Sequence, residues 1–208
     1  MDTTLILVLA VIVAASRPVR IPSLRIDVIP IHPFVLLALA LEGGSAAGLV
    51  GVAGVLGAAI FRRPRPAAKR LAFNVGTSLV STSAAAWTAG LAGGHPDAPV
   101  NAWVWPLAVA TLVYFSIGTG LVATAIAIER KQGLIETWNR SLRWTALPYA
   151  MGFTVALAAL AACEVSYGAG MLLMIAPCWC LVLAYRAEAR RHAGPAAGGS
   201  HAPAGSRL

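Results

Sequence analysis

Residues 61–76 read FRRPRPAAKRLAFNVG and separate two long apolar runs. Five basic residues lie close together in this stretch: Arg62, Arg63, Arg65, Lys69 and Arg70. In a soluble protein such a cluster would suggest a surface that binds nucleic acid. Between two membrane helices it would instead mark a loop that is kept in the cytoplasm.

The composition favours the membrane interpretation. Of the 208 residues, 58% are hydrophobic and only 12% are charged, whereas soluble domains have roughly a quarter charged residues. The apolar residues also fall in long blocks, as membrane helices require. The net charge of +8 is therefore read as a sign of orientation, and no nucleic-acid partner is expected because the aromatic interleaving that would support one is missing.

Seven apolar segments predict an all-α, polytopic transmembrane helix bundle. A span needs about 20 residues, and the last five segments meet that length. The first two are short, so the number of spans falls to six if the first does not cross the membrane. We assign residues 1–193 to the bundle and the Gly-, Pro- and Ala-rich residues 194–208 to a disordered cytoplasmic tail. The predicted segments are 3–16, 28–41, 44–61, 71–91, 102–128, 145–163 and 166–185.

The basic residues alternate between connections. All sixteen Lys and Arg residues lie in the connections after the first, third, fifth and seventh segments. The remaining connections hold Asp2, Glu42, Asp97 and Glu164 and no basic residue. Because basic loops stay in the cytoplasm, we predict a multi-pass protein of the bacterial cytoplasmic membrane, with its N-terminus outside and its C-terminus inside. The basic residues 62–70 would then face the cytoplasm and the anionic lipid headgroups.

Small residues predict close helix packing in two segments. The third segment repeats glycine every three or four residues, and a shorter cluster, SIGTG, occupies residues 116–120 of the fifth. Small side chains let helix backbones approach each other where lipid supplies no hydrophobic driving force. We expect packing inside the bundle, with a contact between two copies as the alternative. The glycines concerned are Gly44, Gly48, Gly51, Gly54, Gly57, Gly118 and Gly120.

Polar residues in apolar segments are candidate binding residues, because burying a polar group in a bilayer is costly. Each has an ordinary alternative. A carboxylate at an interface is simply solvated, an amide can hold a neighbouring helix, and hydroxyls such as those from Thr77 to Ser83 usually bond to carbonyls of their own helix. His32 and Asp27 flank the entry to the second segment. A proton relay between them is the functional alternative to the more ordinary roles of capping and interfacial solvation. The candidate ligand-binding residues are Glu42, Asn74, Thr77, Ser81 and Tyr114.

No motif calls for an enzyme, a metal or a cofactor. The sequence lacks the nucleophile, zinc-protease and phosphate-loop patterns. His95 and Asp97 lack a third ligand. Cys178 and Cys180 are spaced C-x-C, which on a helix points the two thiols about 200° apart. We therefore expect no catalytic residue, no metal and no cofactor.

Four stretches resemble the membrane-associated sensor domains that precede HD-GYP phosphodiesterase, GGDEF cyclase or histidine kinase domains in bacterial signalling proteins. They are LALALEGGSAAGLVGVAGVLGAAIFRR, KRLAFNVGTSLVSTSAAAWTAGLAGG, GLVATAIAIERKQ and MLLMIAPCWCLVLAYRAEARRHA. The resemblance covers residues 1–193 and implies a bundle of six to eight helices that senses a signal. No HD, GGDEF or kinase motif occurs in the 208 residues. Either a separate protein supplies the output, or the chain is a remnant of a longer sensor, or the resemblance is only to a bundle architecture.

Three functions follow as hypotheses. The first is a sensor-like protein that binds a small ligand or lipid and couples to a cytoplasmic partner through its basic face, where residues 132–143 would form an amphipathic surface helix. The second is a structural subunit or assembly factor of a larger membrane complex. The third is the substrate-binding component of a transporter, since the helix packing is also similar to that of energy-coupling-factor vitamin transporters. It would need a polar cavity open to the outside, lined by Glu42, Thr77, Ser81 and Tyr114. Membrane lipids are expected partners, and an oligomer is possible.

Overall fold

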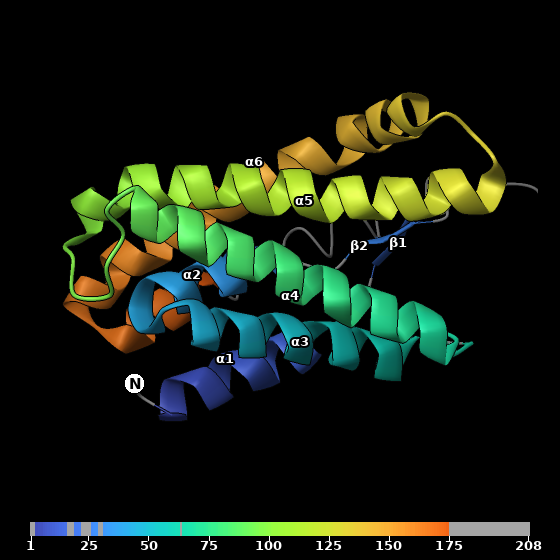
Figure 1. Ribbon diagram of the computed structural model, residues 1–208. Coiled ribbons are helices and arrows are strands. Elements are labelled where there is room, and N and C mark those ends of the chain that lie inside the picture. The colour runs from blue at the N-terminus through green and yellow to red at the C-terminus, as the bar shows by residue number, and fades with distance from the viewer. Residues whose placement is uncertain (1–2, 16–18, 22–25, 29–30, 63, 175–208) are drawn as a thin grey trace, which may run out of the picture.

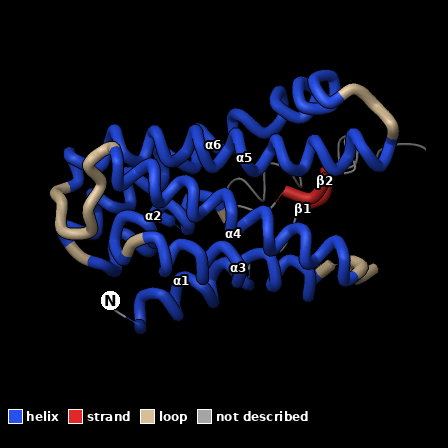
Figure 2. The backbone as a smooth tube through the Cα atoms, in the orientation of Figure 1, coloured by secondary structure: helices blue, strands red, loops and turns tan. Residues whose placement is uncertain are grey.

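The computed structural model describes residues 3–15, 19–21, 26–28, 31–62 and 64–174. Arg63, the predicted seventh helix from residue 175 onward, both cysteines of the C-x-C pair and the predicted tail lie outside these ranges. Helices dominate the described residues, as predicted (Figure 2). The elements are α1 (Thr3–Ala15), β1 (Val19–Ile21), β2 (Ile26–Val28), α2 (His32–Glu42), α3 (Gly44–Phe61), α4 (Ala68–Leu91), the 3₁₀-helix η1 (Val100–Trp103), α5 (Val104–Arg130) and α6 (Leu134–Val165), and residues 167–174 are also helical.

The long helices form a bundle around α2. The helices α3, α4 and α5 follow one another side by side in alternating directions, and α6 returns along α5 (Figure 1). The short helix α2 contacts α1, α3, α5 and α6. All its residues from His32 to Ala40 are buried. The centre of the bundle is therefore a helix that most of the others enclose.

Large apolar side chains cover the outside of the bundle. Every helix longer than α2 carries them, for example Leu56, Trp87, Leu112 and Leu147, which are 42–69% exposed. Soluble proteins rarely expose contiguous apolar surface on this scale, whereas a lipid-facing surface requires it. Within the part of the chain that the structure describes, three stretches are long and apolar enough to cross a membrane: Gly44–Phe61, Val100–Arg130 and Thr145–Val165. The prediction of a membrane-type helical bundle is confirmed in this form, and the count of seven spans is not.

The glycines of α3 pack inside the bundle. A β-carbon added at Gly44 would approach the Ala86 side chain of α4 to 2.8 Å, and one added at Gly57 would overlap the backbone of Ala14 in α1. The small residues of α3 therefore let two helices, α4 and α1, approach it at close range. Gly118 lies beside α4, but a β-carbon at Gly120 would meet nothing within 4 Å. The structure thus gives Gly120 no packing contact of the predicted kind.

Two parts of the structure near the start of the chain differ from the predicted boundaries. The helix α2 begins at His32 and not at residue 28, because Pro33 suits the first turn of a helix and disfavours its interior. Residues 17–27, expected to be a loop, contain a two-stranded antiparallel hairpin in which Arg20 pairs with Asp27. Its strands read VRI and IDV, so apolar β-branched residues alternate with charged ones.

The surface helix predicted at 132–143 is the first part of α6. This helix begins at Leu134 and continues through Pro148 to Val165. Proline removes one backbone hydrogen bond and bends a helix, and Figure 1 shows the first part of α6 turning away from the direction of the rest. We call residues 134–144 the α6 arm.

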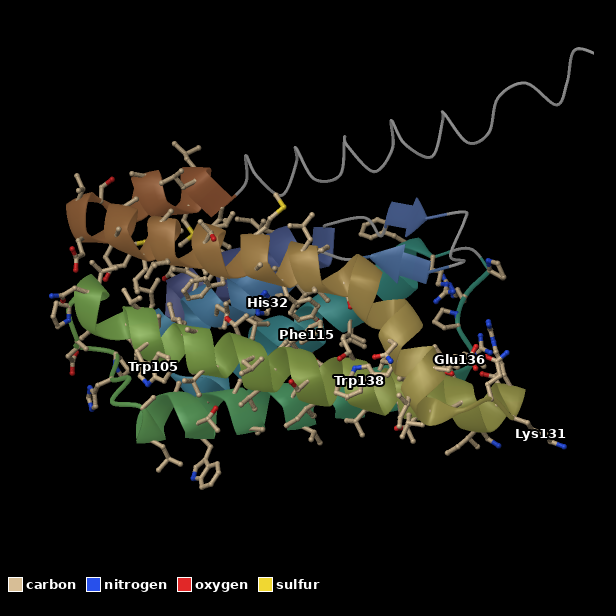
Figure 3. All side chains as sticks on the ribbon, turned by 90° about the horizontal axis from the view of Figure 1, so that it is seen from above. His32, Trp105, Phe115, Lys131, Glu136 and Trp138 are labelled. Carbon is tan, nitrogen blue, oxygen red and sulfur yellow. The ribbon has the colours of Figure 1, made fainter. Side chains whose placement is uncertain are left out.

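Among the described residues, the basic connections after α3 and after α5 lie at the same end of the bundle. A salt bridge of 2.8 Å joins Arg70, at the start of α4, to Glu129, at the end of α5. At the opposite end the backbone N–H of Val100 donates to Glu164 at 2.8 Å. Figure 3 shows Lys131 at the first end and Trp105 at the second. We call the first end the basic end; its described basic residues are Arg62, Arg65, Lys69, Arg70, Arg130 and Lys131.

Candidate functional site

The innermost helix begins inside the bundle and not at its surface. Eleven residues give α2 a length of about 16 Å at 1.5 Å per residue, roughly half of a ~30 Å hydrocarbon core. It ends at Gly43, whose φ of 88° suits glycine, and α3 then runs back beside it. Ile31, just before α2, lies against Gly54, ten residues along α3 from Gly44. The first residues of α2 are therefore near the middle of the bundle, a depth at which broken helices of membrane proteins often form binding sites.

His32 stands at this helix start and packs between aromatic rings. Its imidazole lies 4.6 Å from the Tyr149 ring of α6 and 5.3 Å from the Tyr114 ring of α5, measured between ring centroids. The Phe115 ring meets Tyr149 edge-on at 4.9 Å. Figure 3 shows His32 and Phe115 in the middle of the bundle. His32 is 6% exposed, and neither ring nitrogen has a hydrogen-bond partner among the described residues.

Hydroxyl groups from α4 face the same region. Ser78, Ser81 and Thr82 are buried, and their oxygens have no hydrogen-bond partner in the described part of the chain. Ser78 approaches the Tyr114 phenol, but the geometry falls short of a hydrogen bond. The ordinary role predicted for this run, bonding to carbonyls of the same helix, is therefore wrong for these three residues. We call His32, Ser78, Ser81, Thr82, Tyr114 and Tyr149 the central cluster.

The predicted ligand-binding residues do not form one site. Ser81 and Tyr114 belong to the central cluster, and Thr77 is half-buried beside Ser78 on α4. Asn74 is exposed, one turn closer to the basic end. Glu42 is half-buried at the far end of α2, ten residues and so about 15 Å from His32. The cavity proposed for a transporter, lined by Glu42 together with the α4 hydroxyls, is not assembled by these positions.

Sequence reasoning missed the position of His32. Placing the start of the second helix at residue 28 put His32 in its first turns, near an interface. The preference of proline for the first helical turn would have started the helix beside Pro33 and drawn attention to the residue before it. Tyr149 was not among the candidate binding residues, because nothing in its apolar segment marked it as one.

A hydrogen bond between α6 and α5 connects the α6 arm to the central cluster. The indole N–H of Trp138 donates to the Thr119 hydroxyl at 3.0 Å, and that hydroxyl donates to the Phe115 carbonyl at 2.6 Å. Phe115 in turn contacts Tyr149. Tyr149 follows Pro148, the residue that bends α6. The arm is therefore held to α5 within a few residues of the cluster.

The described residues contain no group of three or more His, Cys, Asp or Glu side chains placed to hold a metal ion. No family model, no curated protein and no solved structure matches the chain. The central cluster offers one imidazole, three aliphatic hydroxyls and two phenols. They lie where a helix begins inside the bundle.

Proposed function

We propose that this chain is a sensor-like integral membrane protein of the bacterial cytoplasmic membrane. It binds a small ligand or lipid at the central cluster and couples to a separate protein through the basic end, which faces the cytoplasm. The observation that carries this proposal is the buried imidazole of His32, whose two nitrogens have no hydrogen-bond partner in the described part of the chain. An ionisable group held at membrane depth is costly and is most often retained for function.

The α6 arm supplies the route from the site to the partner. Tyr149 touches His32 on one side of Pro148, and Trp138 bonds Thr119 on the other side. A ligand that displaces the Tyr149 ring would change the bend at Pro148 and so the position of the arm. The arm presents Leu134 and Ile135 to the outside, 47% and 73% exposed, next to the charged residues of the basic end.

Removing the Thr119 hydroxyl should loosen the arm. Thr119→Val keeps the side-chain shape but removes the acceptor for Trp138, at a cost of about 0.5–1.5 kcal/mol. Amide hydrogen exchange of residues 134–144 should rise. Thr124→Val is the matched control, because the Thr124 hydroxyl donates to Gly120 of its own helix, and it should leave exchange in the arm unchanged. Equal exchange in both variants would refute the role of the Trp138–Thr119 contact.

Native mass spectrometry of the gently extracted protein tests the proposed function. We expect a bound small molecule or lipid to survive extraction, together with a protein partner. His32→Phe keeps a ring and removes both nitrogens, and it should lose the bound molecule. His95→Phe, at the opposite end of the bundle, is the control. Binding that is unaffected by His32→Phe would refute the assignment of the site.

A substrate-binding subunit of a transporter is the second candidate, since such proteins also use helices that begin at membrane depth. It needs a polar path from the cluster to the outer end. The α2 side chains from Pro33 to Ala40 are apolar and buried, with Phe34, Val35, Leu36 and Leu37 at most 1% exposed. The sensor proposal needs no such path, and we prefer it for that reason.

A further inference from the structure

The α4 hydroxyls of the central cluster differ from four threonine hydroxyls elsewhere in the bundle. Thr88, Thr119, Thr124 and Thr154 each donate to the carbonyl four residues earlier in their own helix, at 2.6–3.1 Å. This bond is the usual one for hydroxyls in membrane helices. Ser78, Ser81 and Thr82 occupy regular turns of α4 but make no such bond. Their oxygens are therefore free to bond to something between the helices.

Two glycines border these hydroxyls. A β-carbon at Gly51 of α3 would lie 2.7 Å from Ser78 Oγ and 3.4 Å from Thr82 Oγ1. One at Gly118 of α5 would lie 3.4 Å from Ser81 Oγ and 4.0 Å from the Tyr149 hydroxyl oxygen. The α4 hydroxyls therefore face the backbones of two neighbouring helices, α3 and α5, at their glycines.

The surrounding groups favour a neutral occupant that both donates and accepts hydrogen bonds. The described charged side chains on the helices of the cluster lie at the ends of the bundle: Glu42 on α2, Lys69 and Arg70 on α4, Glu129 and Arg130 on α5, and Glu136 and Glu164 on α6. A neutral imidazole offers one donor and one acceptor, and each hydroxyl offers both. Buried water typically makes about three hydrogen bonds to groups of this kind.

We propose that the central cluster is a binding site for ordered water in the middle of the bundle. Water molecules accept from and donate to His32, Ser78, Ser81 and Thr82, and the phenols of Tyr114 and Tyr149 complete the network. This water site is the same place at which the proposed function puts a ligand, so a bound ligand would displace the water. The water itself can be tested without any ligand. Displacing well-ordered water favours a molecule that reproduces its hydrogen bonds.

A double-mutant cycle between Ser81→Ala and Tyr149→Phe, measured as the melting temperature in lipid nanodiscs, tests the inference. Each change removes only a hydroxyl. If water bridges the two groups, Ser81→Ala should lower the melting temperature by about 2–4 °C, and it should have much less effect in the Tyr149→Phe background. The control cycle pairs Tyr149→Phe with Ser83→Ala, because Ser83 is exposed on the same helix, and it should be additive.

Two results of the cycle would overturn the inference. If Ser81→Ala raises the melting temperature equally in both backgrounds, the hydroxyl has no partner at all. If it causes an equal small loss in both, the hydroxyl bonds to its own helix. The unmodified protein provides a second measurement that does not depend on any variant folding: nuclear Overhauser contacts between water and the backbone amides of His32, Ser81 and Thr82. Their absence would also overturn the inference.

The two proposals fail in different ways. Coupling between Ser81 and Tyr149 without any bound molecule in native mass spectra would leave the water site intact and remove the support for ligand binding. If a bound molecule depends on His32 but Ser81 and Tyr149 are not coupled and no water contacts are seen, the ligand site would stand and the water site would be refuted.

Discussion

Leu112→Arg should strongly impair insertion of the chain into the membrane. Leu112 lies eight residues into α5 and is 65% exposed on the outside of the bundle. An arginine near the middle of a membrane helix costs about 2.5–3.5 kcal/mol on insertion-based scales, whereas the same change on the surface of a soluble protein is nearly neutral. The measurement is the fraction of chain that resists alkaline extraction from membranes.

Ile128→Arg is the matched control for this prediction. Ile128 is also an outward-facing residue of α5, 74% exposed, but it lies in the last turns of the helix at the basic end. An arginine there can extend its guanidinium to the interface, so insertion should change little. Equal extraction of the two variants would contradict the membrane assignment of α5.

Gly57→Ala should destabilise the bundle, although alanine is the better helix former. The added methyl would overlap the Ala14 backbone of α1, and backbone atoms cannot move aside as a flexible side chain can. Overpacking of this kind costs about 1–3 kcal/mol. A β-carbon at Gly76 of α4 would meet nothing within 4 Å, so Gly76→Ala should stabilise by up to about 1 kcal/mol through helix propensity alone.

Thermal unfolding of both glycine variants in the same detergent measures the difference. We expect the two melting temperatures to move in opposite directions from that of the unmodified protein. If Gly57→Ala were as stable as Gly76→Ala, α1 would not pack on α3 at this position.

Sequence patterns predicted the outer helices well and the centre poorly. The third segment was predicted with the bounds that α3 has, and the Arg70–Glu129 pair shows that the basic connections after α3 and α5 lie at the same end. The enclosed position of α2 could not be predicted in the same way. In a membrane bundle both the lipid-facing and the enclosed surfaces are apolar, so hydropathy does not distinguish an enclosed helix from one that faces lipid.

The site was only partly predictable for a related reason. Ser81 and Tyr114 were chosen as polar residues in apolar segments, and both belong to the central cluster. The same rule selected Asn74 and Glu42, which lie elsewhere. What brings His32, Tyr114 and Tyr149 together is the depth at which α2 begins, and that depth depends on contacts between helices far apart in the sequence.

The enclosed position of α2 has a consequence for biogenesis. Eleven residues are too few for the insertion machinery to recognise as a span, yet this helix leaves the ribosome before the α5 and α6 walls that will surround it. We expect α2 to enter the bilayer as the short limb of a hairpin with α3, and to reach its final environment only after Tyr149 of α6, which packs against His32, has been synthesised. The helix at the centre of the bundle would then be synthesised early but packed last.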